Sequence, residues 1–234
     1  MNKPSSFDEY AVDYDAALAQ GIKVSGEDKT YFAHGRVAWL ARRLETLQAR
    51  PASVLDFGCG TGSATPYFYK LLSVTASLGL DTSAKSIEVA RQQHGSDRAR
   101  FDTLAAYKPA SSMDLAFCNG VFHHIPLAER AGAATIIYQS LRPGGWLAFW
   151  ENNPWNPGTR LVMRRIPFDR DAIPLTPPAA GRLMRAVGFE VVRTDFLFVF
   201  PRLLGWFRPL ERLLCRLPLG AQYQLLCRKS QNDR

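Results

Sequence analysis

A glycine-rich turn that directly follows a short apolar segment restricts the fold of this chain more than any other feature. Residues 53–57 have the pattern of a buried strand, and residues 58–62 read Gly-Cys-Gly-Thr-Gly. In an open α/β sheet, ligands bind outside the carboxyl ends of the strands, where the first turn must let a ligand lie against the backbone. Glycine permits this approach and the positive φ angles that it requires. We therefore expect residues 58–62 to form the first strand-to-helix turn of an α/β domain.

Strand and helix patterns alternate on both sides of this turn. The expected helices cover residues 31–50, 63–72, 83–94, 129–141 and 179–187. The expected strands cover residues 53–57, 74–80, a short stretch around Phe101, 113–119, 146–150, 189–200 and 222–228. The alternation predicts a mainly parallel sheet with right-handed crossovers and helices on both faces. Because 234 residues suffice for one substantial core, we expect a single domain over residues 1–234.

Two segments interrupt the alternation. Residues 1–30 are polar and aromatic, with aromatic side chains at helical spacing up to Tyr14. We interpret this N-terminal arm as a lid that closes over a bound ligand, with ordinary helix packing as the alternative. Residues 152–178 contain six prolines, which are too many for a regular element. We expect this proline-rich segment to be an excursion on the substrate side of the domain.

The positive charge is concentrated near the C-terminal end of the chain. Residues 182–234 hold ten Lys and Arg against four acids, a net of +6 out of +8 for the whole chain. Within them, residues 201–218 place leucines and aromatic residues on one helical stripe and arginines on another, with Pro209 as a break. Such a basic amphipathic insertion suits a bilayer interface or a lipid-like substrate, and it equally suits a substrate lid or a dimer surface.

Cysteine and histidine are sparse. The four cysteines show no C-x-x-C spacing, and only His123 and His124 are neighbours among the four histidines. We therefore expect reduced thiols and no metal site. The sequence has no apolar run of 18 residues and no leader pattern, so we expect a cytoplasmic protein, with peripheral contact to the inner membrane through residues 201–218 as an option.

The spacing of the glycines separates two classes of cofactor. Binders of nicotinamide and flavin dinucleotides use G-x-G-x-x-G, and the helix after the turn faces a pyrophosphate. This chain has G-x-G-x-G instead, with Asp56 two residues before the first glycine. Asp81 ends the next expected strand and is placed to accept hydrogen bonds from ribose hydroxyls. Such an electronegative corner favours a cationic nucleoside without phosphates.

Four segments in order resemble the motifs of the class I S-adenosylmethionine-dependent methyltransferases. They are residues 55–62, 78–83, 113–126 and 141–147. The resemblance implies a Rossmann-like sheet of seven strands whose last strand is antiparallel, and S-adenosylmethionine as the cofactor. By this resemblance, Asp102 contacts the adenine amino group and Asn119 lies near the methionyl part. Together with the lid residue, the expected cofactor-binding residues are Tyr14, Asp56, Gly58, Cys59, Gly60, Gly62, Asp81, Thr82, Asp102 and Asn119.

Three residues are candidates for the chemistry of methyl transfer. His123 and His124 follow the fourth strand, and one of them is either the base that deprotonates the acceptor or part of the pocket wall. Glu151, just past the fifth strand, either orients the acceptor or satisfies backbone groups of the next loop. We expect a small, hydrophobic or lipid-linked acceptor.

Other functions receive less support. Nucleic acid is discounted because the sequence Asn153-Pro154-Trp155 follows the fifth strand, whereas base-flipping amino methyltransferases carry a similar signature after the fourth. Two alternatives stay open: a cofactor-binding subunit that is active only with a partner chain, and a nucleotide-dependent oxidoreductase of the NAD type. Nothing in the sequence indicates the oligomeric state.

Overall fold

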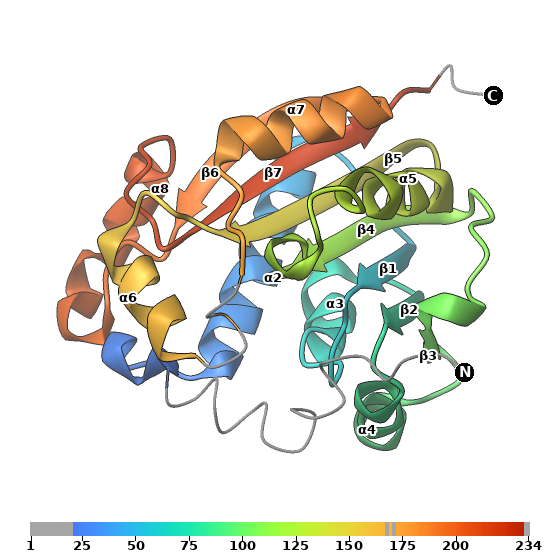
Figure 1. Ribbon diagram of the computed structural model, residues 1–234, viewed down its shortest axis with the longest axis horizontal. Helices are drawn as coiled ribbons and strands as arrows, with labels where there is room; N and C mark the ends of the chain where they lie inside the picture. The colour runs from blue at the N-terminus through green and yellow to red at the C-terminus, as the bar shows by residue number, and fades with distance from the viewer. Residues whose placement is uncertain (1–20, 167–168, 170–171, 232–234) are drawn as a thin grey trace.

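The computed structural model describes residues 21–166, 169 and 172–231. Within them, seven strands form one sheet in the order β3-β2-β1-β4-β5-β7-β6 (Figure 1). The strands are β1 Ser53–Phe57, β2 Ala76–Asp81, β3 Ala99–Thr103, β4 Met113–Asn119, β5 Leu141–Asn152, β6 Phe189–Leu197 and β7 Gln222–Lys229. Neighbouring strands from β3 to β5 are parallel, and β7 is antiparallel to both β5 and β6. The predicted sheet of seven strands with an antiparallel last strand is confirmed.

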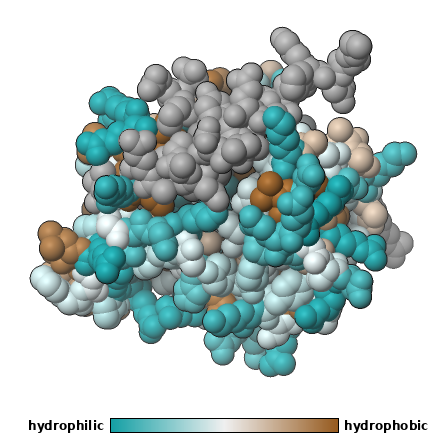
Figure 2. Space-filling model, turned by 90° about the horizontal axis from the view of Figure 1, so that it is seen from below, coloured by the Kyte–Doolittle hydropathy of each residue, from teal (hydrophilic) through white to brown (hydrophobic). Residues whose placement is uncertain are grey.

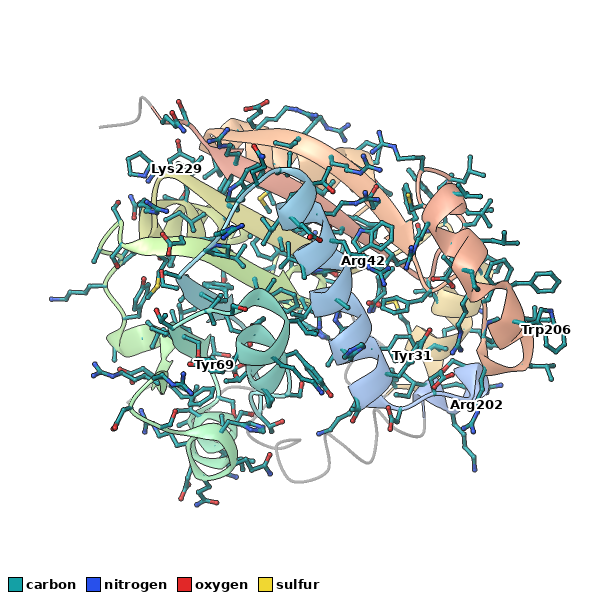
Figure 3. The ribbon with its side chains drawn as sticks, turned by 180° about the vertical axis from the view of Figure 1, so that it is seen from behind. Tyr31, Arg42, Tyr69, Arg202, Trp206 and Lys229 are labelled. Atoms are coloured by element: carbon teal, nitrogen blue, oxygen red, sulfur yellow. The ribbon has the colours of Figure 1, made fainter. Side chains whose placement is uncertain are left out.

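Helices cover both faces of this sheet. The longer ones are α2 Lys29–Thr46, α3 Thr65–Leu72, α4 Ala84–His94, α5 Arg130–Ser140, α6 Pro157–Arg165 and α7 Pro177–Val187. Figure 1 shows α5 and α7 along one face, and Figure 3 shows α2 and α3 across the other. Each face has its own apolar core: Ile137 and Met184 pack on one side, and Leu40 and Phe68 on the other. This double cover explains why the central strands are apolar on both faces.

Polar caps set the start of several helices. The Asp28 carboxylate accepts a hydrogen bond from the Tyr31 amide at 2.7 Å and begins α2. Asn156 caps α6 in the same way through the Thr159 amide at 2.9 Å, and Thr176 caps α7. In α6 and α7 a proline occupies the first turn, where its missing N–H costs nothing.

The prediction that residues 152–178 contain no regular element is wrong. They include α6, and Pro177 and Pro178 begin α7 two residues before the expected start. The prolines were counted as helix breakers, but those at helix starts are compatible with a helix. Strand β5 also differs, since it begins at Leu141, and its pairing with β4 shifts register between Met113 and Leu115. The Pro-Gly-Gly sequence of residues 143–145 therefore lies inside β5, although the expected strand began only at residue 146.

Residues 201–218 do not form one amphipathic helix. A 3-10 segment, η6 Arg202–Leu210, precedes the single turn α8 Glu211–Leu214, and Leu204 has non-helical backbone angles. Arg208 joins this insertion to the start of α2, because it donates to Glu27 at 2.7 Å and lies over the Tyr31 ring. Leucines and aromatic residues of the insertion are exposed, with Leu203 at 81% and Trp206 at 70%. Figure 3 shows Trp206 directed away from the body of the molecule.

Polar residues predominate on the face of the molecule that is seen from below in Figure 2. Figure 2 shows a face on which hydrophilic residues cover most of the coloured atoms, and hydrophobic ones form small groups. None of the helices within residues 21–166 and 172–231 combines the length and apolar composition that crossing a bilayer requires.

A buried carboxylate fixes α2 against the sheet. Asp195 of β6 is 1% exposed and accepts hydrogen bonds from Trp39 at 3.1 Å and from Arg43 at 2.8 Å. Arg193 donates to the same carboxylate at 2.7 Å. A buried charge that is paired and hydrogen-bonded in this way holds its partners in place. Helix α2 is thereby positioned so that Arg36 lines the cavity described next.

Candidate active site

A cavity of about 410 Å³ lies at the carboxyl ends of β1, β4 and β5. This is the edge of an open α/β sheet where ligands are expected. Helix α6, the η2 turn Lys23–Ser25 and residues 198–201 enclose the cavity from outside the sheet. Figure 1 shows α6 near the end of β5, close to the C-terminal insertion. Polar lining residues include Arg36, Asn119, His123, His124, Asn152 and Asp169.

The glycine turn forms one wall of this cavity. Gly58, Gly60 and Gly62 have φ angles of +75°, +52° and +77°, which confirms the predicted left-handed turn. A Cβ atom on Gly58 would lie 2.2 Å from a methyl group of Val121, so packing also demands glycine there. A Cβ on Gly60 would meet no atom within 4 Å, because this residue faces the open cavity. Gly60 therefore leaves room for a ligand against the backbone.

Asp81 lies beside the turn at the end of β2. One carboxylate oxygen accepts a hydrogen bond from the Gly60 amide at 2.9 Å, and the other accepts from the Ser83 amide at 2.9 Å. A carboxylate has lone pairs for further donors, such as hydroxyl groups of a sugar. The structure thus places Asp81 where the sequence predicted it, although its contact with a ribose stays a prediction.

Asp56 makes the corner between β1 and β2 electronegative. It is 4% exposed, and burial together with the neighbouring Asp81 carboxylate raises its pKa to about 7, while Arg36 acts in the opposite direction. Burial also raises the pKa of the Cys59 thiol well above its ordinary value. Cys59 therefore lines the cavity as a neutral thiol, and a neutral thiol is a poor nucleophile.

Asn119 contributes an acceptor atom without a partner. It ends β4 and lines the cavity, and its Oδ1 atom is buried without a hydrogen bond from any described residue. Buried polar atoms are nearly always hydrogen-bonded, so an orphaned acceptor on a cavity wall indicates a ligand with a donor group. This agrees with the predicted role of Asn119 near the methionyl part of the cofactor.

Five of the predicted cofactor residues that the structure describes are not among those lining the cavity: Asp56 and Asp81, discussed above, and Gly62, Thr82 and Asp102. Asp102 is half exposed, and its carboxylate pairs with Arg91 at 3.4 Å and accepts from the Thr103 amide. Thr82 is exposed at the end of β2, and Gly62 packs behind the turn against His94 and Phe101. Tyr14 lies outside the described residues. Their contacts with a cofactor remain predictions.

His123 and Glu151 form a buried pair at the opposite wall. The Glu151 side chain is 0% exposed, and its Oε2 atom lies 2.5 Å from Nδ1 of His123. Its Oε1 atom accepts a hydrogen bond from the Phe122 amide at 2.7 Å. Burial alone would lower the pKa of His123, but the carboxylates of Glu151 and Asp169 raise it to about 10. Glu151 therefore orients the His123 ring from behind and does not line the cavity itself.

Asp169 is a site residue that sequence reasoning missed. Its Oδ1 atom lies 3.4 Å from Nε2 of His123 and 3.3 Å from Nε2 of His124. The expectation that histidines are too sparse for a metal cluster considered only neighbours in sequence, whereas these three residues have the arrangement of a possible metal-ligand set. The sequence signal for Asp169 was weak: it is an acidic residue within residues 152–178, the segment expected on the substrate side. Arg36 and the aromatic wall of Phe198 and Phe200 were missed as well.

Part of the chain is similar to known methyltransferases. A family model described as "Methyltransferase domain" matches residues 55–147. The chain is 34% identical over 139 residues to trans-aconitate 2-methyltransferase of Methylobacterium nodulans, which covers 59% of this chain and 50% of that protein. It is 36% identical over 110 residues to the enzyme of the same name from Deinococcus radiodurans, covering 46% and 42%. The chain thus matches about half the length of these curated relatives or less.

Solved structures share the fold at low sequence identity. The complex between the Haloferax volcanii Trm112 methyltransferase activator and a methyltransferase matches with a TM-score of 0.68 and 18% identity, over 98% of this chain and 100% of the other. Human N-acetylserotonin methyltransferase in complex with SAM matches with a TM-score of 0.65 and 16% identity, over 95% and 56%.

Proposed function

We propose that the chain is a class I S-adenosylmethionine-dependent methyltransferase that methylates a small-molecule acceptor. One observation carries the proposal. The glycine turn and the His123–His124 pair line the same cavity of about 410 Å³, so a cofactor and an acceptor can be held side by side. Holding two reactants in contact supplies most of the catalysis in a displacement reaction.

The residues at the glycine turn fit S-adenosylmethionine. Gly60 leaves space against the backbone, Asp81 offers carboxylate oxygens for sugar hydroxyls, and Asn119 offers an unpartnered acceptor for the methionyl ammonium. The buried Asp56, whose pKa of about 7 leaves it partly ionised at neutral pH, adds negative charge that favours a cationic ligand and disfavours a pyrophosphate. When bound, S-adenosylmethionine supplies an activated methyl group. The NAD-type alternative lacks both the pyrophosphate spacing and a suitable charge.

The remaining part of the cavity suits an acceptor with a polar end and an apolar body. Histidines and Asp169 form its polar end, while Phe198, Phe200 and Met163 form an apolar wall. This supports a small, hydrophobic or lipid-linked acceptor. The curated relatives are named for trans-aconitate, a carboxylic acid, and Arg36 on the cavity wall is suited to bind a carboxylate. Both acceptor classes belong in the test.

Labelled methyl transfer tests this function. The purified chain is incubated with S-adenosylmethionine carrying a labelled methyl group, in one series with trans-aconitate and in another with lipid, polar and macromolecular fractions of a lysate. We expect label in a small-molecule or lipid product. Label in protein or nucleic acid alone, or no label in any fraction, would refute the proposal.

A partner-dependent activity is the alternative within this family. A methyltransferase of the same fold was solved in complex with an activator protein. In the assay above, activity that appears only when a lysate protein fraction is added would favour this alternative over an enzyme that acts alone.

We also propose that the C-terminal insertion contacts a lipid surface. Its exposed apolar residues are Leu203, Trp206, Phe207, Leu210, Leu213 and Leu217. Arg202, Arg212 and Arg216 lie among them in the sequence, and this combination suits an anionic interface. The insertion also borders the cavity through Pro201, so a lipid-linked acceptor could reach the site from the membrane.

A further inference from the structure

We propose that His123, His124 and Asp169 form a binding site for a divalent metal ion at the acceptor end of the cavity. All three line the cavity, and one potential ligand atom from each lies within 4.8 Å of the other two. Two imidazole nitrogens and one carboxylate oxygen are the ligand types of many catalytic zinc sites. The inference deepens the proposed methyl transfer and rests on it for the role of the metal.

The distances from Asp169 Oδ1 to the Nε2 atoms of the two histidines match those between ligands of one metal ion, and they exceed those of good hydrogen bonds. Asp169 Oδ1 lies 3.4 Å and 3.3 Å from the two Nε2 atoms, and it is buried without accepting a hydrogen bond. An N–H···O hydrogen bond in a buried site is normally about 2.7–3.2 Å long. Ligands at about 2.1 Å from a tetrahedral ion are separated by about 3.4 Å, whereas neighbouring ligands of an octahedral ion are separated by about 3.0 Å. The two separations that involve Asp169 therefore match those between ligands of a tetrahedral ion such as Zn²⁺.

Glu151 has the position of an outer partner of such a site. Its carboxylate lies 2.5 Å from Nδ1 of His123, so a proton on Nδ1 is held there and Nε2 is left as the ligand atom. The Phe122 amide donates to the other oxygen of Glu151 and fixes the carboxylate. A histidine ligand commonly donates its second ring proton to a carboxylate in this way.

The backbone around Asp169 is held against the two histidines. The Asp169 amide donates to Ile166 at 3.1 Å, and the Ile173 amide donates to the carbonyl of His123 at 2.8 Å. Arg130 of α5 donates to the Ile173 carbonyl at 2.6 Å and to Ile125 at 2.8 Å. These contacts place the carboxylate before any ion binds, as a preorganised site requires.

Three protein ligands leave a fourth position of a tetrahedral ion open toward the cavity. An acceptor carboxylate or deprotonated hydroxyl can occupy this position, and its proton is released to solvent when it binds. In the transfer itself, the oxygen–methyl bond forms as the methyl–sulfur bond breaks, and the sulfonium becomes a neutral thioether. The metal would thus select acceptors that bind through an anionic oxygen, and it replaces a histidine base.

Zinc titration tests the site independently of catalysis. The full chain without a histidine tag is treated with a chelator and titrated with ZnCl₂ by calorimetry. We expect one equivalent to bind, with affinity at least about tenfold lower in Asp169→Asn and in His124→Asn, and about 10–100-fold lower in Glu151→Gln. Asp97→Asn is the control, because Asp97 is exposed and is not among the residues that line the cavity. Circular dichroism checks that each variant is folded.

Two results would overturn the inference: no stoichiometric zinc binding to the intact chain, or equal binding by the chain and by both ligand variants. Co²⁺ provides a second readout, because a tetrahedral site gives an intense visible spectrum and an octahedral one a weak spectrum. A weak spectrum would contradict the tetrahedral assignment. S-adenosylhomocysteine binding is measured on the same samples. If it persists while zinc fails to bind, the metal site is refuted and the proposed function stands; zinc binding without any methyl transfer refutes the function alone.

Discussion

The two walls of the cavity are built in different ways. The side of the cavity at the glycine turn, which we call the cofactor wall, comes from short stretches of sequence. Gly58 and Gly60 follow β1, and Asp81 ends the adjacent parallel strand β2. The opposite side, which we call the acceptor wall, is formed by residues of α2, η4 Phe122–His124 and α6 together with Asp169 and Phe198. These parts are far apart in the chain. The first wall is therefore visible as a motif, and the second appears only after folding. The following predictions test whether the two walls also act separately.

The largest effect is expected on the cofactor wall. Gly60→Val together with Asp81→Ala should weaken binding of S-adenosylhomocysteine more than about 10³-fold, because the valine fills the ligand space and the ribose loses its acceptor. Calorimetry measures the dissociation constant. Gly132→Ala is the matched control, since a Cβ there meets no atom within 4 Å in a helix. Unchanged binding in the double variant would contradict the assignment of this wall.

Asp56 should link the cofactor wall to the pH dependence of stability. The folded-state pKa of Asp56 is raised from 3.8 to about 7, so the folded chain binds more protons than the unfolded chain between these values. Stability is therefore lost as the pH rises from about 4 to 7. Asp56→Asn should remove this loss and raise the free energy of unfolding at pH 8 by as much as about 4 kcal/mol, with little effect near pH 4.

Urea unfolding at the two pH values measures this difference. An equal effect of Asp56→Asn at both would show that Asp56 is ionised throughout. The same variant should weaken binding of cationic S-adenosylmethionine more than that of S-adenosylhomocysteine, because only the former carries a sulfonium charge.

A variant of Glu151 should affect the acceptor wall and leave the cofactor wall intact. Glu151→Gln should lower the rate of methyl transfer about 100-fold, because His123 loses the carboxylate that orients it. Binding of S-adenosylhomocysteine should change less than about twofold, because the glycine turn is untouched. Glu190→Gln on the exposed side of β6 is the control. A parallel loss of rate and cofactor affinity would show that the walls are coupled.

The smallest effect concerns the C-terminal insertion. The triple variant Leu203→Ser, Trp206→Ser and Leu213→Ser should reduce sedimentation with anionic liposomes about tenfold, because these exposed side chains provide the apolar contact. Leu127→Ser, at 66% exposure before α5, is the control. Sedimentation that is unchanged in the triple variant refutes a lipid contact through this surface.

The sequence predicted most of the sheet and the glycine turn, because both depend on local patterns. Residues 53–62 combine an apolar strand with glycines that must adopt positive φ, and the structure confirms both features. Helix α6 was missed because its prolines were read as breakers, although Pro157 follows the Asn156 cap. Residues 201–218 form short turns in which the expected break, Pro209, lies inside η6, and Arg208 holds them to Glu27 before α2.

The acceptor wall could be predicted only in part. His123, His124 and Glu151 were identified because the histidines follow the end of β4 and Glu151 lies near the end of the adjacent β5, where parallel strands bring side chains together. Asp169 and Phe198 belong to no motif, and their place depends on long-range contacts such as that between Ile173 and His123. No periodicity encodes such contacts, so these residues required the folded structure.

The most direct test of the central claim is a pair of calorimetric titrations of the intact chain. One uses S-adenosylhomocysteine and the other NADH, which share an adenosine but differ in charge and in the pyrophosphate. An open, electronegative turn at Gly60 and Asp81 predicts saturable binding of S-adenosylhomocysteine at one site and none of NADH. Binding of NADH without binding of S-adenosylhomocysteine would contradict the account.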